Sequence, residues 1–162
     1  MTVSFGGVEY LHRWSKAAQH EFTPQPDADL TKWQDMVTIN VHDAARNGDQ
    51  LAQVANAVVS NYQKVGKILR TDSKPRTADR PAEHLVVAVL GTAGFLEAAF
   101  ARFYLNDGVG YVVVYSHRVY GTAAGPAMSE WLKANGPQIE KTLMGWTGAP
   151  GVAALKALPQ SQ

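Results

Sequence analysis

The feature of this sequence that most constrains its fold is a dense run of β-forming residues between Glu83 and Tyr120. Two apolar stretches, 95–105 and 109–120, flank an Asp107-Gly108 pair, and a third stretch covers 85–90. An Asp-Gly pair between two such stretches is a strong hairpin signal, because both residues accept the positive φ angles of a tight turn. The middle stretch also has helical spacing, but its neighbours favour a strand. The sequence therefore predicts three consecutive antiparallel strands.

Alternation of apolar and polar residues predicts further strands nearer the N-terminus. The alternation is clearest in Val8–Trp14 and Met36–His42, where every second residue is apolar or aromatic over much of the stretch. Such a period of two is typical of a strand with one buried face. Two shorter extended pieces, Gln19–Thr23 and Ile68–Thr71, complete the predicted set of strands.

Amphipathic patterns predict the helices. Apolar residues from Leu51 to Val65 recur at three- and four-residue steps, and Asp49 is the expected N-cap of this helix. A short helix capped by Asp27 or Asp29 is expected before the strand at Met36. Apolar helical faces from Pro126 to Trp146 are interrupted at residues 135–137, which predicts either two helices or one helix with a break.

These elements predict a single α+β domain over residues 1–162, with an antiparallel sheet of about five to seven strands packed by about two or three amphipathic helices. The expected core spans residues 8–146, and residues 147–162 form a tail rich in Gly, Ala and Pro. Over residues 8–146 the order of elements resembles the PsbP-like superfamily, which includes small periplasmic and thylakoid-lumen proteins. The resemblance rests on element order without a diagnostic motif, so it implies a fold and no functional residue.

Composition and charge exclude several classes of protein. Fifteen Lys and Arg against fourteen Asp and Glu leave a net charge of +1, so no charge excess attracts nucleic acid. A basic stretch from Lys64 to Arg80 is more typical of a solvated surface. The absence of cysteine excludes disulfides, thiolate nucleophiles, Cys-type zinc sites and iron–sulfur clusters. No apolar run approaches the ~20 residues that span a bilayer, so no membrane insertion is expected.

The same composition bears on location. Charged residues are only 18% of the chain, which is rich in Ala, Thr and Gln, a composition that suits a periplasmic or secreted domain. We therefore expect an extracytoplasmic chain. The residues from Met1 to Gly7 show neither the basic start nor the apolar stretch of a secretory signal, so this expectation requires a processed chain, and the alternative is a cytoplasmic protein.

Motifs for common cofactors and nucleophiles are absent. No Gly-Lys-Ser or Gly-Lys-Thr occurs, which excludes a phosphate-binding loop of the Walker type, and no Gly-x-Ser-x-Gly nucleophile elbow is present. The five histidines show none of the helical zinc-ligand spacings. We expect neither a metal nor a cofactor.

The predicted hairpin identifies candidate site residues. A three-residue turn would place Glu97 opposite His117, whereas a four-residue turn would place it opposite Arg118. Either register sets a carboxylate against a cationic or titratable group, which indicates a polar cluster beneath a binding cleft; the alternative is an exposed cross-strand pair. Tyr115 shares a face with His117, and His84 follows Glu83. The candidate ligand-binding residues are Glu97, His117, Arg118, His84 and Tyr115.

The function these features favour is that of a non-catalytic binding or accessory protein whose ligand is another protein or a small molecule. The alternative is a small hydrolase or lyase that uses His20, His84 or His117 together with a carboxylate as general base. Trp131 and Trp146 lie in helical apolar stripes and are expected in the core.

Overall fold

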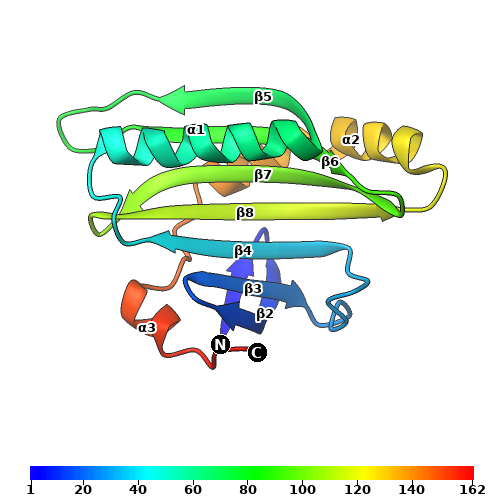
Figure 1. The fold of residues 1–162 in the computed structure, drawn as a ribbon, viewed down its shortest axis with the longest axis horizontal. Coiled ribbons are helices and arrows are strands. Elements are labelled where there is room, and N and C mark those ends of the chain that lie inside the picture. The colour runs from blue at the N-terminus through cyan, green and yellow to red at the C-terminus, as the bar shows by residue number, and fades with distance from the viewer.

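The predicted three-stranded run forms part of one open antiparallel sheet of eight strands, in the order β1-β2-β3-β4-β8-β7-β6-β5 (Figure 1). The computed structural model describes all residues from 1 to 162. The strands are β1 Thr2–Phe5, β2 Val8–Lys16, β3 Gln19–Pro24, β4 Asp35–His42, β5 Gly66–Lys74, β6 Glu83–Gly91, β7 Phe95–Asn106 and β8 Val109–Tyr120. The predicted α+β class and antiparallel sheet are confirmed.

The turn between β7 and β8 sets the register of the sheet centre. Asp107 and Gly108 have φ angles of 50° and 79°, as a tight hairpin turn requires, and Asn106 pairs with Val109. Leu105 pairs with Gly110, so the turn that joins them has the four residues 106–109. The four-residue alternative is therefore the correct one, and Glu97 faces Arg118.

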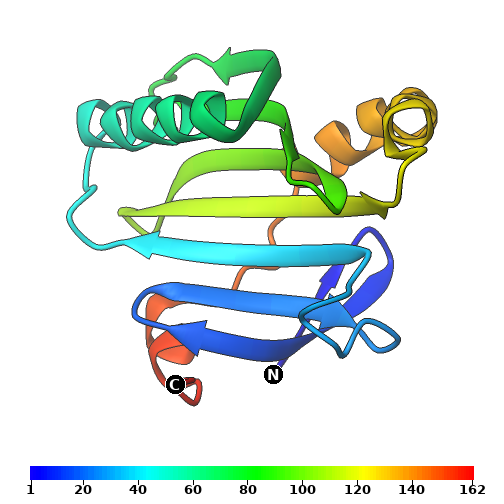
Figure 2. The same cartoon turned by 45° about the vertical axis from the view of Figure 1, so that its right-hand side comes forward.

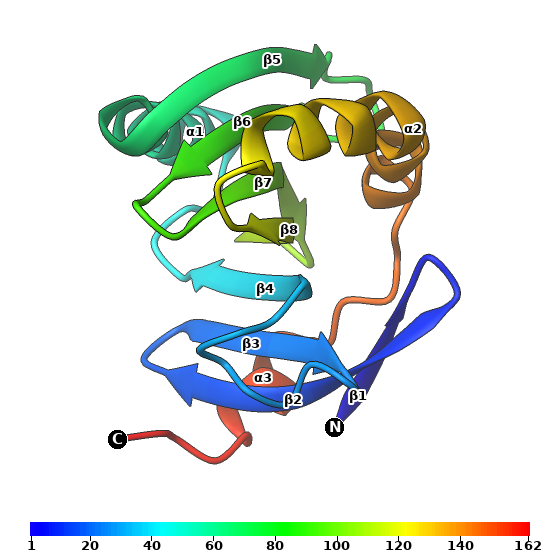
Figure 3. The ribbon, with the colours of Figure 1, turned by 90° about the vertical axis from the view of Figure 1, so that its right-hand side faces the viewer.

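Two long helices pack on opposite faces of the sheet (Figure 3). Helix α1, Gly48–Val65, lies against β5, β6 and β7, and helix α2, Ala124–Met144, lies against β7 and β8. Figure 2 shows α1 and α2 near the same end of the sheet, where β5 and β6 lie. The short helix α3, Val152–Lys156, follows α2. None of the three helices is long and apolar enough to cross a membrane.

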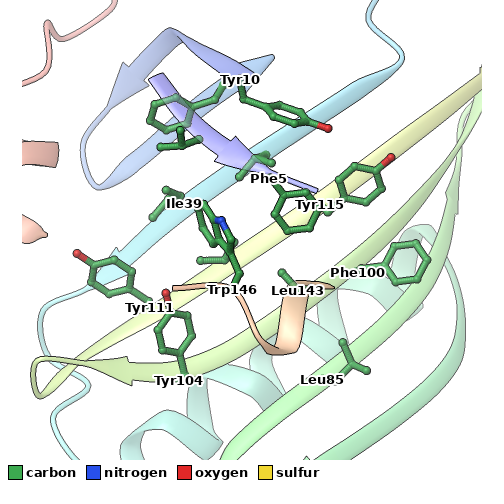
Figure 4. Close-up of a cluster of buried hydrophobic side chains, with 14 of the residues drawn as sticks. Phe5, Tyr10, Ile39, Leu85, Phe100, Tyr104, Tyr111, Tyr115, Leu143 and Trp146 are labelled. Carbon is green, nitrogen blue, oxygen red and sulfur yellow. The ribbon is translucent and has the colours of Figure 1, made fainter. Parts of the chain in front are cut away.

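Each face of the sheet has its own core. The larger cluster, with 21 buried residues, lies on the α2 face and includes Phe100, Tyr111, Tyr115 and Trp146 (Figure 4). A smaller cluster of 8 buried residues lies beneath α1. The larger cluster also contains Phe5 from β1 and residues of the C-terminal tail such as Leu155. The core is therefore wider than the expected span of 8–146.

The sheet has eight strands, so the expectation of five to seven is wrong. The strand missed is β1, a four-residue strand whose Val3 and Phe5 point into the core. Gly6 and Gly7 join it to β2 with positive φ angles of 58° and 79°. A glycine pair of this kind next to alternating residues is itself a hairpin signal.

Three further expectations about local structure need correction. No helix follows Asp27 or Asp29; instead the Asp29 carboxylate accepts hydrogen bonds from the backbone N–H and hydroxyl of Thr31, which stabilises a turn. The N-cap of α1 is Asn47 rather than Asp49. The C-terminal helical pattern forms one helix that continues through Pro137.

Candidate functional site

A cleft of about 520 Å³ opens on the α2 face, between α2 and the β1–β2 hairpin. We call it the hairpin cleft. The turn at Gly6 approaches Thr142 of α2, since a Cβ built on this glycine would lie 3.9 Å from the Thr142 methyl group. The cleft is lined by Phe5, Gly6, Val8, Tyr10, Pro24, Asp35, Tyr115, His117, Trp131, Asn135, Gln138, Ile139 and Thr142.

Asp35 organises the polar part of the hairpin cleft. Its Oδ1 atom accepts a 2.6 Å hydrogen bond from the Tyr115 hydroxyl and lies 2.9 Å from His117 Nδ1. An ionised carboxylate only accepts hydrogen bonds, so the proton of this contact lies on Nδ1. The pairing of β4 with β8 brings these residues together, because Asp35 at the start of β4 is directly opposite His117.

Aromatic rings hold this cluster in place. The Trp131 ring of α2 stacks on the His117 ring with centroids 3.9 Å apart and planes 1° from parallel. Phe5 from the hairpin stacks on Tyr115 at 5.4 Å. Trp131, expected in the core, is partly buried: it packs against the larger core cluster and also lines the cleft. Trp146 is buried as expected. The rings restrict rotation of both side chains that donate to Asp35.

Several polar atoms of the hairpin cleft remain free to meet a ligand. Asp35 Oδ2, His117 Nε2 and the Tyr10 hydroxyl have no hydrogen-bond partner in the protein. Burial, followed by the charge of Asp35, raises the pKa of both Tyr10 and Tyr115 above the ordinary tyrosine value. Both hydroxyls are therefore protonated near neutral pH, and that of Tyr10 is available as a donor. The cleft thus offers a carboxylate acceptor, an imidazole nitrogen and one hydroxyl between aromatic walls.

The structure divides the five predicted site residues among three places. Tyr115 and His117 lie together in the hairpin cleft. Glu97 and Arg118 form an ion pair of 2.8 Å on the opposite face of the sheet. His84 contacts the Ser73 hydroxyl at 2.8 Å near the loop before β6, and its Nε2 is buried without a partner. The five predicted residues therefore do not meet in one place.

The histidine–carboxylate pair considered for catalysis exists only once. His117 and Asp35 are the one histidine and carboxylate within 4.0 Å of each other. His20 instead contacts the buried Ser15 hydroxyl, which also contacts His12. Sequence reasoning missed Asp35, because nothing local marks a residue whose partners lie about eighty positions away in the chain. Only the order of the strands could have revealed it.

No group of three His, Asp or Glu side chains has the arrangement to hold a metal ion. Comparisons of the chain with protein-family models and with curated proteins found no match.

Proposed function

We propose that this protein binds a small organic molecule in the hairpin cleft, and that the ligand has a ring and a hydroxyl or amino group that donates to Asp35. The observation that carries the proposal is the Asp35–Tyr115–His117 cluster, which is fixed at the floor of a cleft with apolar walls. The protein acts in this proposal as a binding or accessory protein and not as a catalyst.

The dimensions and chemistry of the cleft support this class of ligand. Sites for small molecules commonly measure roughly 300–1,000 Å³ and combine apolar walls with a few convergent polar groups. The cleft falls in this range at about 520 Å³, and Phe5, Tyr10 and Trp131 provide flat apolar surfaces. Asp35 forms no contact with a lysine or arginine, so a ligand carboxylate would meet an uncompensated negative charge. Ligands with hydrogen-bond donors are therefore favoured over anions.

Three probes that share one ring and differ in their polar group test the proposal. Benzyl alcohol, benzylamine and benzoate would each be titrated into ¹⁵N-labelled protein while ¹H–¹⁵N spectra are recorded. We expect the alcohol and the amine to shift the amide signals of Asp35, Tyr115 and Asn135 in a saturable way, and benzoate to leave them unchanged.

A matched pair of variants assigns the binding to the carboxylate. Asp35→Asn removes the charge and should weaken benzylamine binding, whereas Asp79→Asn, at an exposed loop position, should leave it as in the natural chain. Equal shifts with benzoate, or no saturable shift with any of the three probes, would contradict the proposal.

One observation favours a second candidate, a small hydrolase or lyase. Asp35 fixes the Nδ1–H of His117, which leaves Nε2 of the neutral ring able to accept a proton in the cleft, as a general base requires. Hydrolysis of para-nitrophenyl acetate that exceeds the buffer rate and is lost in His117→Asn would favour this candidate. Equal rates for the two proteins would exclude it for esters.

The resemblance to the PsbP-like superfamily and the extracytoplasmic location both stay predictions, and neither contributes to this proposal.

A further inference from the structure

A larger cleft, of about 760 Å³, opens between the start of α1 and the loop that joins β5 to β6. We call it the arginine cleft. Ala45, just before α1, accepts a 2.8 Å backbone hydrogen bond from Gly110 at the start of β8. His84, at the start of β6, pairs with Phe103 near the end of β7. Both walls of the cleft therefore lie at the end of the sheet that carries the β7–β8 turn (Figure 1).

Three arginines line the arginine cleft, and none of them forms an ion pair. Arg46 precedes α1, and its Nε donates a 2.6 Å hydrogen bond to the carbonyl oxygen of Asp43. Arg76 and Arg80 lie in the β5–β6 loop, are exposed, and donate no side-chain hydrogen bond within the protein. Each guanidinium group has five N–H donors in a planar fork that matches the oxygens of a phosphate group. The two loop arginines therefore keep all of these donors for a ligand.

Two aspartates, Asp49 and Asp79, line the same cleft. Three arginines against two aspartates leave a formal charge of +1 with His84 neutral. Neither aspartate forms an ion pair, so neither one neutralises an arginine by direct contact. The cleft therefore attracts an anion, and Asp79 opposes that attraction from within the loop.

The start of α1 adds backbone donors to the cleft. The first N–H groups of a helix have no partner within the helix. Asn47 accepts those of Gln50 and Leu51, at 2.9 and 3.0 Å, which leaves the N–H groups of Gly48 and Asp49 at the cleft. No atom lies within 4 Å of a Cβ built on Gly48, so the space beside this residue is open. The N-terminal end of a helix also favours negative charge through its dipole.

An independent observation comes from His84, which lines the cleft. Its Nε2 is the only buried side-chain nitrogen or oxygen in the protein that has no hydrogen-bond partner. Its Nδ1 lies 2.8 Å from the Ser73 hydroxyl. When that hydroxyl donates to Nδ1, the neutral ring carries its proton on Nε2, and this N–H needs an acceptor. Buried polar groups are normally hydrogen-bonded, so an oxygen of a bound anion would supply the acceptor that the protein lacks.

From this arrangement we infer that the arginine cleft binds a phosphate group, with Arg76 and Arg80 as its counter-ions and with His84 Nε2 and the first N–H groups of α1 as further donors. The cleft falls in the range of roughly 300–1,000 Å³ that is common for small-molecule sites, so it has room for an organic part beside the phosphate. The same chemistry is offered by inorganic phosphate and by a small phosphate ester. The inference does not depend on the hairpin cleft, because the two sites share no residue.

The test uses the full chain and probes that separate the phosphate from the rest of the ligand. Glycerol 3-phosphate represents the ester and inorganic phosphate the free anion, while glycerol and acetate serve as the neutral and carboxylate controls. All titrations are made at one ionic strength, because salt screens exposed arginines. Binding is followed by the ¹H–¹⁵N shifts of the Gly48, Asp49 and Thr77 amides and by the imidazole nitrogen signals of His84.

We expect saturable shifts from one or both phosphates and none from glycerol or acetate. The signal of His84 Nε2 should move more than that of Nδ1, because Nε2 gains a partner and Nδ1 keeps Ser73. Tighter binding of glycerol 3-phosphate would identify an ester as the ligand. Equal or tighter binding of inorganic phosphate would identify the free anion.

Variants then assign the site. Arg76→Gln and Arg80→Gln should each weaken phosphate binding by about fivefold, and the double variant by about tenfold or more. Lys133→Gln, at an exposed position on α2, removes the same charge and should not change the affinity. Asp79→Asn should strengthen phosphate binding by about threefold, because it removes a carboxylate that repels the anion.

Three results would overturn the inference. The first is the absence of saturable shifts with both phosphates in a protein whose spectrum is that of a folded chain. The second is an unchanged affinity in the Arg76→Gln/Arg80→Gln double variant, which would show that phosphate binds elsewhere. The third is a His84 Nε2 signal that stays in place while the amide signals move, which would show that the anion does not meet this nitrogen.

Discussion

Arg102 offers the sharpest test of how α2 is fixed to the sheet. This arginine of β7 is 8% exposed in its side chain, and its Nε donates a 2.7 Å hydrogen bond to Glu83, which is 13% exposed. Its Nη1 also donates to the carbonyl oxygens of Leu143 and Trp146, at 3.3 and 2.6 Å. The Leu143 carbonyl lies in the last turn of α2 and also accepts a hydrogen bond from the Trp146 N–H at 3.1 Å, whereas the Trp146 carbonyl lies just after the helix. Arg102 therefore ties the end of α2 and the residues that follow it to the sheet.

The structure allows the cost of losing Arg102 to be estimated. The substitution Arg102→Met keeps much of the volume but leaves the Glu83 carboxylate and the Trp146 carbonyl without this donor, while the Leu143 carbonyl keeps its hydrogen bond from the Trp146 N–H. Breaking a buried pair by removing one partner costs about 3–5 kcal/mol, since the other charge remains buried. Glu83→Gln should cost less, about 1–3 kcal/mol, because Arg102 keeps both carbonyl partners and its contact with the Tyr104 ring at 3.9 Å.

Urea unfolding followed by tryptophan fluorescence would give the free energy of unfolding of both single variants and the double variant. The double variant should lose less than the sum of the two single losses, with a coupling of about 1–3 kcal/mol, because it no longer buries an unpaired carboxylate. A loss below about 1 kcal/mol for Arg102→Met, or strict additivity, would refute the reasoning that this pair is buried and holds α2.

Three further predictions concern pH, backbone packing and capping. Burial raises the pKa of Tyr62 and Tyr104 to about 12. The contribution of these two groups to the free energy of unfolding should be level below pH ~10, where unfolded tyrosine is protonated, and should fall between about pH 10 and 12 by up to about 1.4 kcal/mol per unit for each residue. Urea titrations at a series of pH values would measure this fall. Gly66→Ala would place a Cβ in collision with the Val89 carbonyl oxygen and should lower stability by about 1–3 kcal/mol in thermal unfolding. An unchanged melting temperature would contradict the close approach of β5 to β6. Asn47→Ala removes the acceptor of the Gln50 N–H hydrogen bond at 2.9 Å and should cost about 1 kcal/mol, which circular dichroism during urea unfolding would detect.

The sequence predicts best where the structure depends on local chemistry. The Asp107-Gly108 turn, the alternation of β7 and β8 and the apolar stripe of α1 were all predicted from neighbouring residues, and all form. The four-residue turn also predicted that Glu97 faces Arg118. What this register could not reveal is the loop that carries Trp33, which covers Arg118 and makes the pair largely buried.

The hairpin cleft lay beyond local reasoning because its residues meet through long-range pairing. Asp35 meets Tyr115 and His117 only because β4 pairs with β8, and no pattern near Asp35 indicates which strand lies beside it. A local irregularity also breaks the alternation of β2. A bulge between His12 and Trp14 turns Trp14 to the face opposite His12, although strict alternation would place both on one face.

The central claim is that the hairpin cleft receives a ligand through Asp35, and a crystal structure of the protein soaked with benzylamine tests it most directly. The account predicts the amino group within hydrogen-bond distance of Asp35 Oδ2, with the ring between Trp131 and the β1–β2 hairpin. Benzylamine bound only elsewhere, or a cleft closed by a Tyr10 hydroxyl that itself donates to Asp35, would contradict the claim.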